Sequence, residues 1–360
     1  MLKYLNSFII VKPEEYKDMQ FGKYNFERTF IIAEIGDNHN GSASLAKELI
    51  VAAKDAGADA VKFQTWITEE VFTRHAPKAE YQKKESNSEE SLFEMNKKLE
   101  LSFEDHKTLQ NYANELDILF FSKAGSLTAV DMLFELNVPV IKIGSADLTY
   151  LPLLKKVAEK KIPIILSTGM GTLGEVEDAI SIIYSISDAD LYLMHCTSNY
   201  PAKVEDVNLK AIETLKTAFG LKVGYSDHTI GIEAAIVAVA LGACMIEKHF
   251  TLDKNMEGPD HKASLEPSEF RNMVQAIRNI EKALGDGVKR PVVSEKEIME
   301  KMRKSIVASK DIPTGTVLGE NNLTCKRPGT GIPSKYLPIF FGRKALSFIA
   351  KDEFLKWEDI

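Results

Sequence analysis

Eight short apolar segments recur along the first two thirds of this 360-residue chain, and each ends in a small group of polar residues. The segments are residues 30–36, 60–63, 118–121, 140–143, 162–166, 191–194, 222–225 and 244–246. They are apolar on both faces, as strands are when other elements cover them on both sides. The gaps between them hold stretches with helical spacing of apolar residues, for example 44–56, 129–136, 173–186 and 231–241.

Eight βα units in about 250 residues predict an α/β fold, a closed (β/α)8 TIM barrel. The active site of such a barrel lies at the carboxyl ends of the strands, which is where the polar residues fall. A doubly wound open sheet fits the alternation as well. The chain has no glycine-rich first turn, which makes the open sheet the second choice.

The chain is longer than one barrel needs, and the excess lies at both ends. We expect an N-terminal extension over 1–29, the barrel over 30–284, a linker over 285–299 and a small β-rich domain over 300–360. The start of the linker, GDGVKRPVVS, mixes glycine, proline and charge as domain boundaries do. Beyond it, 305–308, 316–318 and 323–326 are short β-type pieces. A module of about 60 residues has a marginal core, so we expect it to dock on something else.

Composition excludes several classes of protein. No apolar run reaches about 18 residues, so we expect no membrane-spanning helix, and residues 1–29 are too polar for a signal peptide. Cys196, Cys244 and Cys325 show no paired spacing, which indicates a reducing compartment such as the cytoplasm. The net charge of −7, without a basic stripe, argues against nucleic acid as a partner.

Two histidines close neighbouring segments at the expected rim. His228 and His249 end the seventh and eighth segments, so their imidazoles can converge on one ion. Two histidines are a weak metal signal, and a hydrogen-bonded structural role is the alternative. Without a third His or Cys ligand, the pattern favours an open site for a cation such as Mn2+ or Mg2+. For His195 we expect core packing rather than ligation.

Two lysines lie inside apolar segments, Lys62 in AVKFQT and Lys142 in VIKIGS. A lysine in such surroundings has to reach something polar, because an unpaired buried ammonium is costly. Side chains that point outward between helices are the alternative. We favour an anion pocket inside the mouth, to which Ser145 and Ser167 add donors for a phosphate or carboxylate. A Schiff-base lysine is the rival chemistry.

Three carboxylates complete the set of polar residues. Glu34 lies within the first segment, where a carboxylate is either paired with a cation or used for acid–base work. Asp147 and Asp260 fall in loops, where a solvated surface role is the alternative.

Six motifs in order along the chain closely resemble the sialic acid synthase family. They are IAEIGDNHNG (32–41), VKFQT (61–65), ILSTGM (165–170), HCTSNYP (195–201), GYSDHT (224–229) and IEKHFTLDKNMEGPDHKASLEP (246–267). Residues 305–332 look like the antifreeze-like SAF domain, a β-clip-like module, that these synthases carry. The family condenses phosphoenolpyruvate with N-acetylmannosamine or a related amino sugar, and the resemblance implies a domain-swapped homodimer with a divalent metal.

The resemblance also implies residue roles. The positions that match metal ligands are His228 and His249, which with Glu34 and Asp147 form the catalytic set. Those that match phosphoenolpyruvate ligands are Lys62, Lys142, Ser145, Ser167 and Ser226. Those that match sugar contacts are Gln64, Tyr200, Asp260 and Arg327, the last inserted from the SAF domain of the partner subunit.

Two departures from the family pattern fall near the phosphoenolpyruvate end. Members commonly read STPF after the third strand, whereas this chain has Lys123 in place of the threonine, and Lys123 is therefore a further candidate ligand. KIGSAD replaces the more frequent KIPSGE. Legionaminic and pseudaminic acid synthases, which use a diacetamido-trideoxy hexose, are the alternatives within the family. A Schiff-base aldolase and a non-catalytic carbohydrate-binding protein are the alternatives outside it.

Overall fold

The computed structural model describes residues 26–78 and 90–360, and it divides the chain into two units that meet between Gly285 and Asp286. Most of the expected N-terminal extension, residues 1–29, lies outside the described residues. Its last part does not stand apart from the barrel: Arg28 pairs with Asp59 at 2.5 Å, and the Thr29 amide donates to Glu281 at 2.6 Å.

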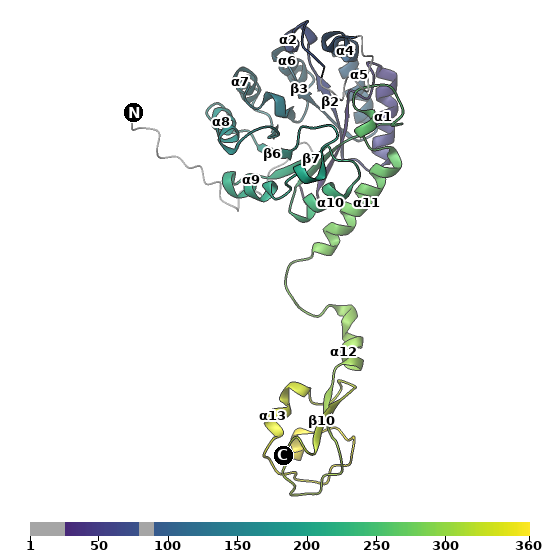
Figure 1. Cartoon of the computed structure of the whole chain (residues 1–360), viewed down its shortest axis with the longest axis vertical. Helices are drawn as coiled ribbons and strands as arrows, with labels where there is room; N and C mark the ends of the chain where they lie inside the picture. The colour runs from purple at the N-terminus through teal and green to yellow at the C-terminus, as the bar shows by residue number, and fades with distance from the viewer. Residues whose placement is uncertain (1–25, 79–89) are drawn as a thin grey trace, which may run out of the picture. The chain divides into compact units, whose positions relative to one another are not determined.

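The first unit is a closed barrel of eight parallel strands in sequence order, which confirms the predicted TIM barrel (Figure 1). The strands are β1 (Phe30–Gly36), β2 (Ala60–Thr65), β3 (Leu119–Ala124), β4 (Ile141–Ile143), β5 (Ile164–Ser167), β6 (Leu191–Cys196), β7 (Val223–Asp227) and β8 (Met245–His249). β1 also pairs with β8, which closes the ring. The open-sheet alternative is wrong.

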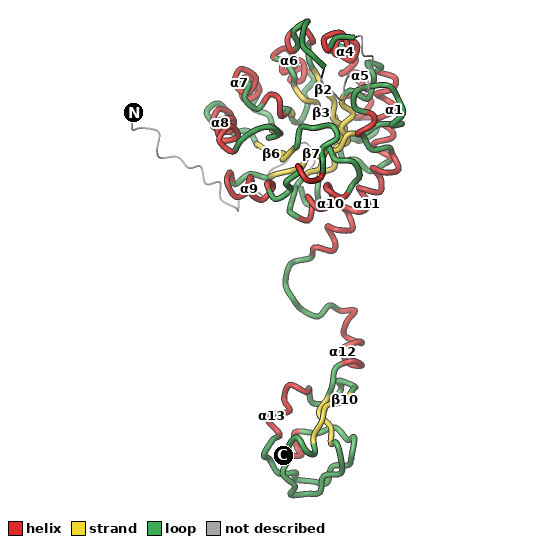
Figure 2. Tube along the Cα trace, viewed as in Figure 1, coloured by secondary structure: helices red, strands yellow, loops and turns green. Residues whose placement is uncertain are grey.

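Helices surround the strands, as Figure 2 shows in red around yellow. They are α1 (Ala43–Asp55), α2 (Thr68–Val71), α4 (Leu92–Leu99), α5 (Phe103–Glu115), α6 (Leu127–Glu135), α7 (Leu151–Glu159), α8 (Leu173–Tyr184), α9 (Ala211–Phe219), α10 (Glu233–Ala240) and α11 (Pro267–Leu284). The sequence dictates their ends: α8 begins at a capping box in which Thr172 and Glu175 each accept a backbone N–H. In α11 the buried residues Phe270, Met273 and Ile277 recur at helical spacing.

Alternation along each strand separates two apolar clusters. The larger lies between strands and helices and includes Ile31, Val61 and Leu193. The smaller fills the lower interior of the barrel; its members are Phe30, Ile32, Ala60, Phe121, Val140, Ile165, Tyr192, Met194 and Met245. Because inward-facing residues recur every second position, the next inward layer above this apolar floor holds Glu34, Lys62 and Lys142.

The second unit, Asp286–Ile360, is small and β-rich. Its strands β9 (Ser305–Ala308) and β10 (Leu323–Lys326) form an antiparallel pair at the predicted positions, and α13 (Leu337–Phe340) is its short second helix. An apolar cluster that includes Ile306, Leu323 and Phe340 forms its core. Residues 316–318, a predicted β-type piece, form only an isolated bridge between Val317 and Lys344.

The expected linker over 285–299 is partly wrong. A helix, α12 (Lys296–Met302), starts inside this range and belongs to the second unit. Its sequence KEIMEKM contains good helix formers, and Glu297 and Lys301, which lie one turn apart, form an ion pair. A boundary based on glycine and proline therefore marks only the start of the connection.

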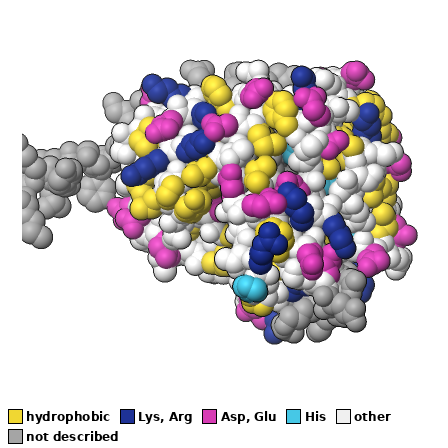
Figure 3. Space-filling model, turned by 90° about the horizontal axis from the view of Figure 1, so that it is seen from above, with side chains coloured by type: hydrophobic (Ala, Val, Ile, Leu, Met, Phe, Trp, Pro, Cys, Tyr) yellow, Lys and Arg dark blue, Asp and Glu magenta, His cyan; other side chains and the backbone are white. Residues whose placement is uncertain are grey.

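No helix among the described residues has both the length and the apolar character that a membrane crossing requires. Figure 3 shows one face of the molecule, on which Lys and Arg side chains are interspersed with Asp and Glu rather than gathered in a stripe. That face has none of the electrostatic character of a nucleic-acid-binding surface.

His39, in the loop after β1, is fully buried, and its Nδ1 accepts the Gly41 amide at 3.0 Å. Burial, with His106 nearby, lowers the pKa of His39 to about 3. In the unfolded chain the pKa is near 6.5, so between about pH 6.5 and 3 only the unfolded state binds this proton. The stability that the neutral ring contributes is therefore present above that window and is lost as pH falls through it.

We expect His39→Asn to gain stability relative to wild type by about 2 kcal/mol between pH 7.5 and 5, because asparagine keeps an acceptor but does not titrate. Urea unfolding of both proteins at each pH measures this difference. Comparison with the variant cancels the contributions of buried carboxyl groups, which have the opposite sign. A difference in unfolding free energy that stays constant with pH would show that His39 does not titrate below its ordinary range.

Candidate active site

A cavity of about 240 Å³ opens above the apolar floor of the barrel. Eleven of the residues singled out in the sequence line it: Glu34, Lys62, Gln64, Lys123, Lys142, Ser145, Ser167, Tyr200, Ser226, His228 and His249. Asp147 and Asp260 lie behind this lining, in contact with Lys123 and His249 respectively. The candidate residues of the barrel thus meet at one site.

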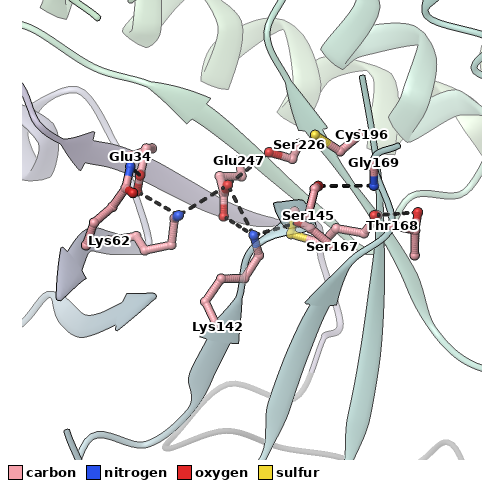
Figure 4. Close-up of polar contacts among 12 residues, drawn as sticks. Glu34, Lys62, Lys142, Ser145, Ser167, Thr168, Gly169, Cys196, Ser226 and Glu247 are labelled. Atoms are coloured by element: carbon pink, nitrogen blue, oxygen red, sulfur yellow. Dashed lines mark hydrogen bonds and ion pairs between the residues drawn. The ribbon is translucent and has the colours of Figure 1, made fainter. Parts of the chain in front are cut away.

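Four charged side chains of alternating sign form a row in the lower layer of the cavity (Figure 4). Lys62 Nζ lies 3.0 Å from Glu34 Oε2 and 3.4 Å from Glu247 Oε1. On the other side of Glu247, Lys142 Nζ lies 3.5 Å from Oε2. Every member is buried, so each charge depends on its neighbours for compensation.

Glu247 is the most important residue that the sequence analysis missed. Its carboxylate lies between Lys62 and Lys142 and pairs with both, and it accepts a hydrogen bond from Ser226 Oγ at 2.9 Å. The signal was available, because Glu247 lies two positions before His249 and therefore on the same inward face of β8.

Asp37, just after β1, was also missed as a site residue. Burial raises its pKa to about 6, although Lys123 and Lys62 oppose the shift. Its Oδ1 is buried without a hydrogen-bond partner among the described residues. With this pKa, Asp37 is mostly ionised at neutral pH and takes up a proton as the pH falls toward 6.

The two carboxylates of the row differ in protonation. Burial raises the pKa of Glu34 to about 7, with Lys62 opposing the shift and Glu247 adding to it. Burial also disfavours ionised Glu247, but Lys142 and Lys62 lower its pKa to about 2. Near neutral pH Glu247 is therefore a fixed negative charge, whereas Glu34 can take or give a proton.

The end of the row at Lys142 is rich in hydrogen-bond donors (Figure 4). Lys142 Nζ donates to Ser167 Oγ at 2.7 Å, and the Gly169 amide donates to Ser145 Oγ at 3.1 Å. A Cβ atom on Gly169 would lie 2.4 Å from Ser198 Oγ and 2.6 Å from Ser145 Oγ, so a larger residue would displace these hydroxyls. Hydroxyls, a backbone amide and an ammonium group are the donors that hold a phosphate.

Lys123 extends into the same cavity and does not block it. Its Nζ lies 3.6 Å from Asp147 Oδ2, and its side chain packs across Gly144, where a Cβ atom would come within 2.8 Å of Lys123 Cε. Burial raises the pKa of Asp147, and Lys123 opposes the shift. Asp147 lies in a short 3-10 turn over Ser145–Asp147 and is mostly buried, so a solvated surface role is wrong for it.

The two histidines face each other at the upper layer, with ring centroids 5.5 Å apart. His228 Nδ1 lies 2.7 Å from the Thr197 carbonyl oxygen and must donate to it, which leaves Nε2 as the ring's acceptor. His249 Nδ1 is buried without a hydrogen-bond partner among the described residues. Burial, with His228 nearby, lowers the pKa of His249 well below its usual value, so its ring is neutral.

A neutral imidazole with an unused nitrogen fits a divalent cation. Burial opposes the charged form of His228, but the adjacent Cys196 outweighs this effect, and the pKa of the ring is raised above its usual value. Across residues 26–78 and 90–360, no three His, Cys, Asp or Glu side chains are grouped to hold a metal ion. The pair therefore suits an open site in which non-protein oxygens complete the coordination shell.

Gln64, Tyr200 and Asp260 contact the glutamate and the two histidines of the site. Gln64 Nε2 donates to Glu34 Oε1 at 3.0 Å, and Tyr200 stacks on His228 with ring centroids 4.0 Å apart. Asp260 Oδ2 lies 3.4 Å from His249 Nδ1. Burial, with Asp37 and Glu34 nearby, raises the pKa of Asp260 to about 8, so a solvated loop role is wrong for it too.

Two predicted residues lie outside this cavity. His195 faces the outer side of β6, where its Nε2 bonds the Val207 carbonyl oxygen at 2.7 Å and its ring stacks on Tyr225. It therefore has the structural role expected of it. Arg327 belongs to the second unit, where its Nε donates to the Met302 carbonyl oxygen at 3.0 Å.

Two family models match this chain. Residues 49–289 match the NeuB family, and residues 303–360 match the SAF domain. The chain belongs to the NeuB family. The NeuB and SAF matches correspond to the barrel and the β-rich unit respectively.

Similar NeuB-family proteins are synthases. The N,N'-diacetyllegionaminic acid synthase of Campylobacter jejuni is 48% identical over 92% of this chain and 99% of its own length. The human N-acetylneuraminate-9-phosphate synthase is 40% identical over 90% of each chain. A crystal structure of the N-acetylneuraminic acid synthetase of Leptospira borgpetersenii superposes with a TM-score of 0.69 at 36% identity, covering 78% of this chain and 95% of that one. This NeuB-family chain is therefore an enzyme of the transferase class.

Proposed function

We propose that the protein condenses phosphoenolpyruvate with a 2-acetamido sugar to give a nonulosonic acid and phosphate. The observation that carries the proposal is the buried row Lys62–Glu247–Lys142, which ends in a cluster of hydroxyl and amide donors. This row supplies two cations and a phosphate cradle on the floor of one cavity. The names of the similar synthases agree with that chemistry.

The phosphate of phosphoenolpyruvate is placed at the serine end, where Lys142, Ser145 and Ser167 hold it. Lys62 lies on the far side of Glu247 in the row, and Ser226 donates to Glu247; these two residues orient the carboxylate. This arrangement presents C3 of the enol phosphate upward, toward the histidine layer. Fixing both anionic groups makes the carbon–carbon step effectively intramolecular.

We place a divalent cation, Mn2+ or Mg2+, at His228 and His249, where it would polarise the aldehyde of the open-chain sugar. Gln64, Tyr200 and Asp260 orient the sugar beside it. C3 of the enol phosphate bonds to the aldehyde carbon, and the positive charge left at C2 is then trapped by water. Glu34, whose pKa of about 7 suits a base, accepts the proton from that water. Asp147 is the second candidate base.

Collapse of the resulting tetrahedral centre breaks the C2–O bond and releases phosphate with the bridging oxygen. The donors around Lys142 stabilise the leaving dianion. Glu247 keeps both lysines charged and in place throughout.

For the acceptor we propose the diacetamido-trideoxy hexose that leads to a legionaminic acid, ahead of N-acetylmannosamine. The identities of 48% and 47% to two legionaminic acid synthases, against 40% to N-acetylneuraminate-9-phosphate synthases and 39% to a pseudaminic acid synthase, support this order. A hydrogen bond to a sugar substituent can discriminate strongly between such sugars. When the sugar lacks that substituent, the protein group that would bind it is left buried and unpaired.

Phosphate release from phosphoenolpyruvate, measured with each sugar in turn, tests the proposal. We expect turnover with the diacetamido-trideoxy hexose, and 18O in the bridging position of phosphoenolpyruvate to appear in phosphate. Turnover with N-acetylmannosamine alone would change the acceptor and keep the reaction. No release with either sugar would overturn the proposed function.

One observation favours a second candidate. Burial lowers the pKa of Lys142, as it does for lysines that form Schiff bases. In that case Lys142 Nζ would condense with a carbonyl product with loss of water, and borohydride would reduce the resulting C=N bond, leaving the product attached to Lys142 through a stable C–N bond. We expect no such adduct by mass spectrometry, because the Lys142 ammonium is hydrogen-bonded to Ser167 beside ionised Glu247.

For the assembly we propose a domain-swapped homodimer in the cytoplasm, in which Arg327 of each subunit contacts the acetamido group of the sugar in the other barrel. The free cysteines Cys196, Cys244 and Cys325 support a reducing compartment. A guanidinium group is suited to a carbonyl acceptor, because its planar donors hold the ligand in a fixed direction.

Lys123→Thr tests whether the added lysine belongs to the phosphate site. We expect the KM for phosphoenolpyruvate to rise about tenfold, because a charge-assisted hydrogen bond is lost, with inhibition by phosphate weakened in parallel. Steady-state kinetics at saturating sugar measure both. The exposed Lys155→Thr on α7 is the control. A change in the KM for the sugar alone would move Lys123 to the acceptor.

A further inference from the structure

Hydrogen bonds join the loop that carries Arg327 to backbone carbonyl groups of the helix α12. We call residues 327–331 the arginine loop. The Gly329 amide donates to the Glu300 carbonyl oxygen at 2.7 Å, and Arg327 Nε donates to the Met302 carbonyl oxygen at 3.0 Å. Both acceptors belong to the last turn of α12, whose carbonyl groups have no partner within the helix. The arginine loop therefore supplies donors that the helix end needs.

The other side of the arginine loop is fixed by β9. Ser305 is fully buried, and its Oγ donates to the Pro328 carbonyl oxygen at 2.7 Å. The same Oγ accepts the Gly331 amide at 2.8 Å. The loop is thus held between α12 and β9, and α12, which contributes no buried side chain to a core, has this loop as its packing partner.

Gly329 is where the loop and α12 come closest. A Cβ atom there would lie 2.7 Å from Arg303 Cβ and 3.1 Å from the Met299 carbonyl oxygen. Real Cβ atoms do not approach that closely, so any larger residue would push the loop away from the helix. The requirement for glycine is one of space, since Gly329 is not among the glycines with positive φ.

The contacts leave the recognition edge of Arg327 open. Its Nε is occupied by Met302, whereas the two terminal nitrogens have no hydrogen bond to any residue that the structure describes. A guanidinium held at Nε presents its remaining N–H groups in one direction, as a preformed fork for an oxygen ligand.

We propose that α12 is the platform that sets the position of Arg327, and that Gly329 is a positioning residue for binding of the acetamido sugar. The inference rests on the proposed function, in which Arg327 contacts that sugar. α12 and Gly329 touch no substrate themselves. They fix the guanidinium through the arginine loop.

Gly329→Ala in the full-length protein tests the proposal. We expect the KM for the sugar to rise about 10- to 100-fold, because displacement of a positioning group by a fraction of an ångström to one ångström has effects of this size. The KM for phosphoenolpyruvate should stay within twofold of wild type. Gly319→Ala is the matched control, since a Cβ atom there has nothing within 4 Å and its φ is not positive.

Two further variants separate positioning from folding. Gly329→Ala/Arg303→Gly removes the Cβ atom that the alanine would meet, and we expect it to recover most of the sugar KM. Ser305→Ala removes both side-chain bonds from β9, and we expect a smaller rise in the same constant. Thermal unfolding of each variant shows whether the C-terminal unit is folded.

The outcomes are distinguishable. If Arg327→Ala leaves the sugar KM unchanged, the proposed role of Arg327 fails, and the positioning role fails with it. If Arg327→Ala raises the sugar KM but neither Gly329→Ala nor Ser305→Ala does so in folded protein, only the positioning role is overturned. If Gly329→Ala unfolds the C-terminal unit, Ser305→Ala becomes the test, and an unchanged sugar KM in that folded variant overturns the positioning role.

Discussion

Glu247→Gln is expected to reduce the free energy of unfolding by about 3 kcal/mol and kcat/KM for phosphoenolpyruvate about 100-fold. Removal of one charge from a buried ionic row is costly, because the opposite charges stay buried without full compensation. Lys142 is affected most: its remaining contact is Ser167, whereas Lys62 keeps Glu34. Displaced lysines then hold the anionic substrate less well.

Denaturant unfolding and steady-state kinetics measure the two effects of Glu247→Gln. Added phosphate should restore more stability to the variant than to wild type, since an anion between the lysines replaces the missing carboxylate. The exposed Glu177→Gln on α8 is the control for a lost surface charge. Unchanged stability together with unchanged kinetics would mean that the two lysines do not depend on Glu247.

Removal of divalent metal is expected to lower phosphate release by at least about 1000-fold, which corresponds to roughly 4 kcal/mol of transition-state stabilisation. Added Mn2+ should restore the wild-type enzyme but not His249→Ala. The reason is that Nδ1 of His249 is buried without a hydrogen-bond partner among the described residues, and its neutral ring is available as a ligand.

Mn2+ binding by electron paramagnetic resonance gives a readout independent of turnover. His195→Ala is the matched control, because His195 faces outward from β6 and bonds the Val207 carbonyl oxygen. We expect it to bind Mn2+ as wild type does. Full activity in the presence of a strong chelator, or normal Mn2+ binding by His249→Ala, would contradict the metal site.

The barrel and most of its site could be predicted from two patterns in the sequence. Helical spacing between eight apolar strands predicted the barrel. Polar residues in and after these strands, such as Lys142 and His228, predicted where the site lies. What sequence could not supply was the pairing inside the barrel. The spacing of Glu247 from His249 places it on the inward face of β8, but its shared contacts with Lys62 and Lys142 exist only in the closed barrel.

Other features depend on tertiary contacts alone. Asp260 falls in a loop rich in charge, yet the fold buries it against His249 and raises its pKa. α12 follows a glycine- and proline-rich stretch that marks a boundary, and its contacts with Arg327 and Gly329 show that it belongs to the second unit. Local composition indicates where a chain bends, but not which later segment will satisfy a helix end.

The apolar floor of the barrel has a kinetic consequence. Phe30, Ile32 and Phe121 close the lower interior, so the cavity that holds the charged row has an apolar floor and lies above it. Two substrates in such a cavity bind one above the other, and the substrate that binds nearer the floor has to enter before the one above it. Under the placement proposed above, the enol phosphate is loaded first and the sugar closes the cavity over it, so the fold itself imposes an order of addition.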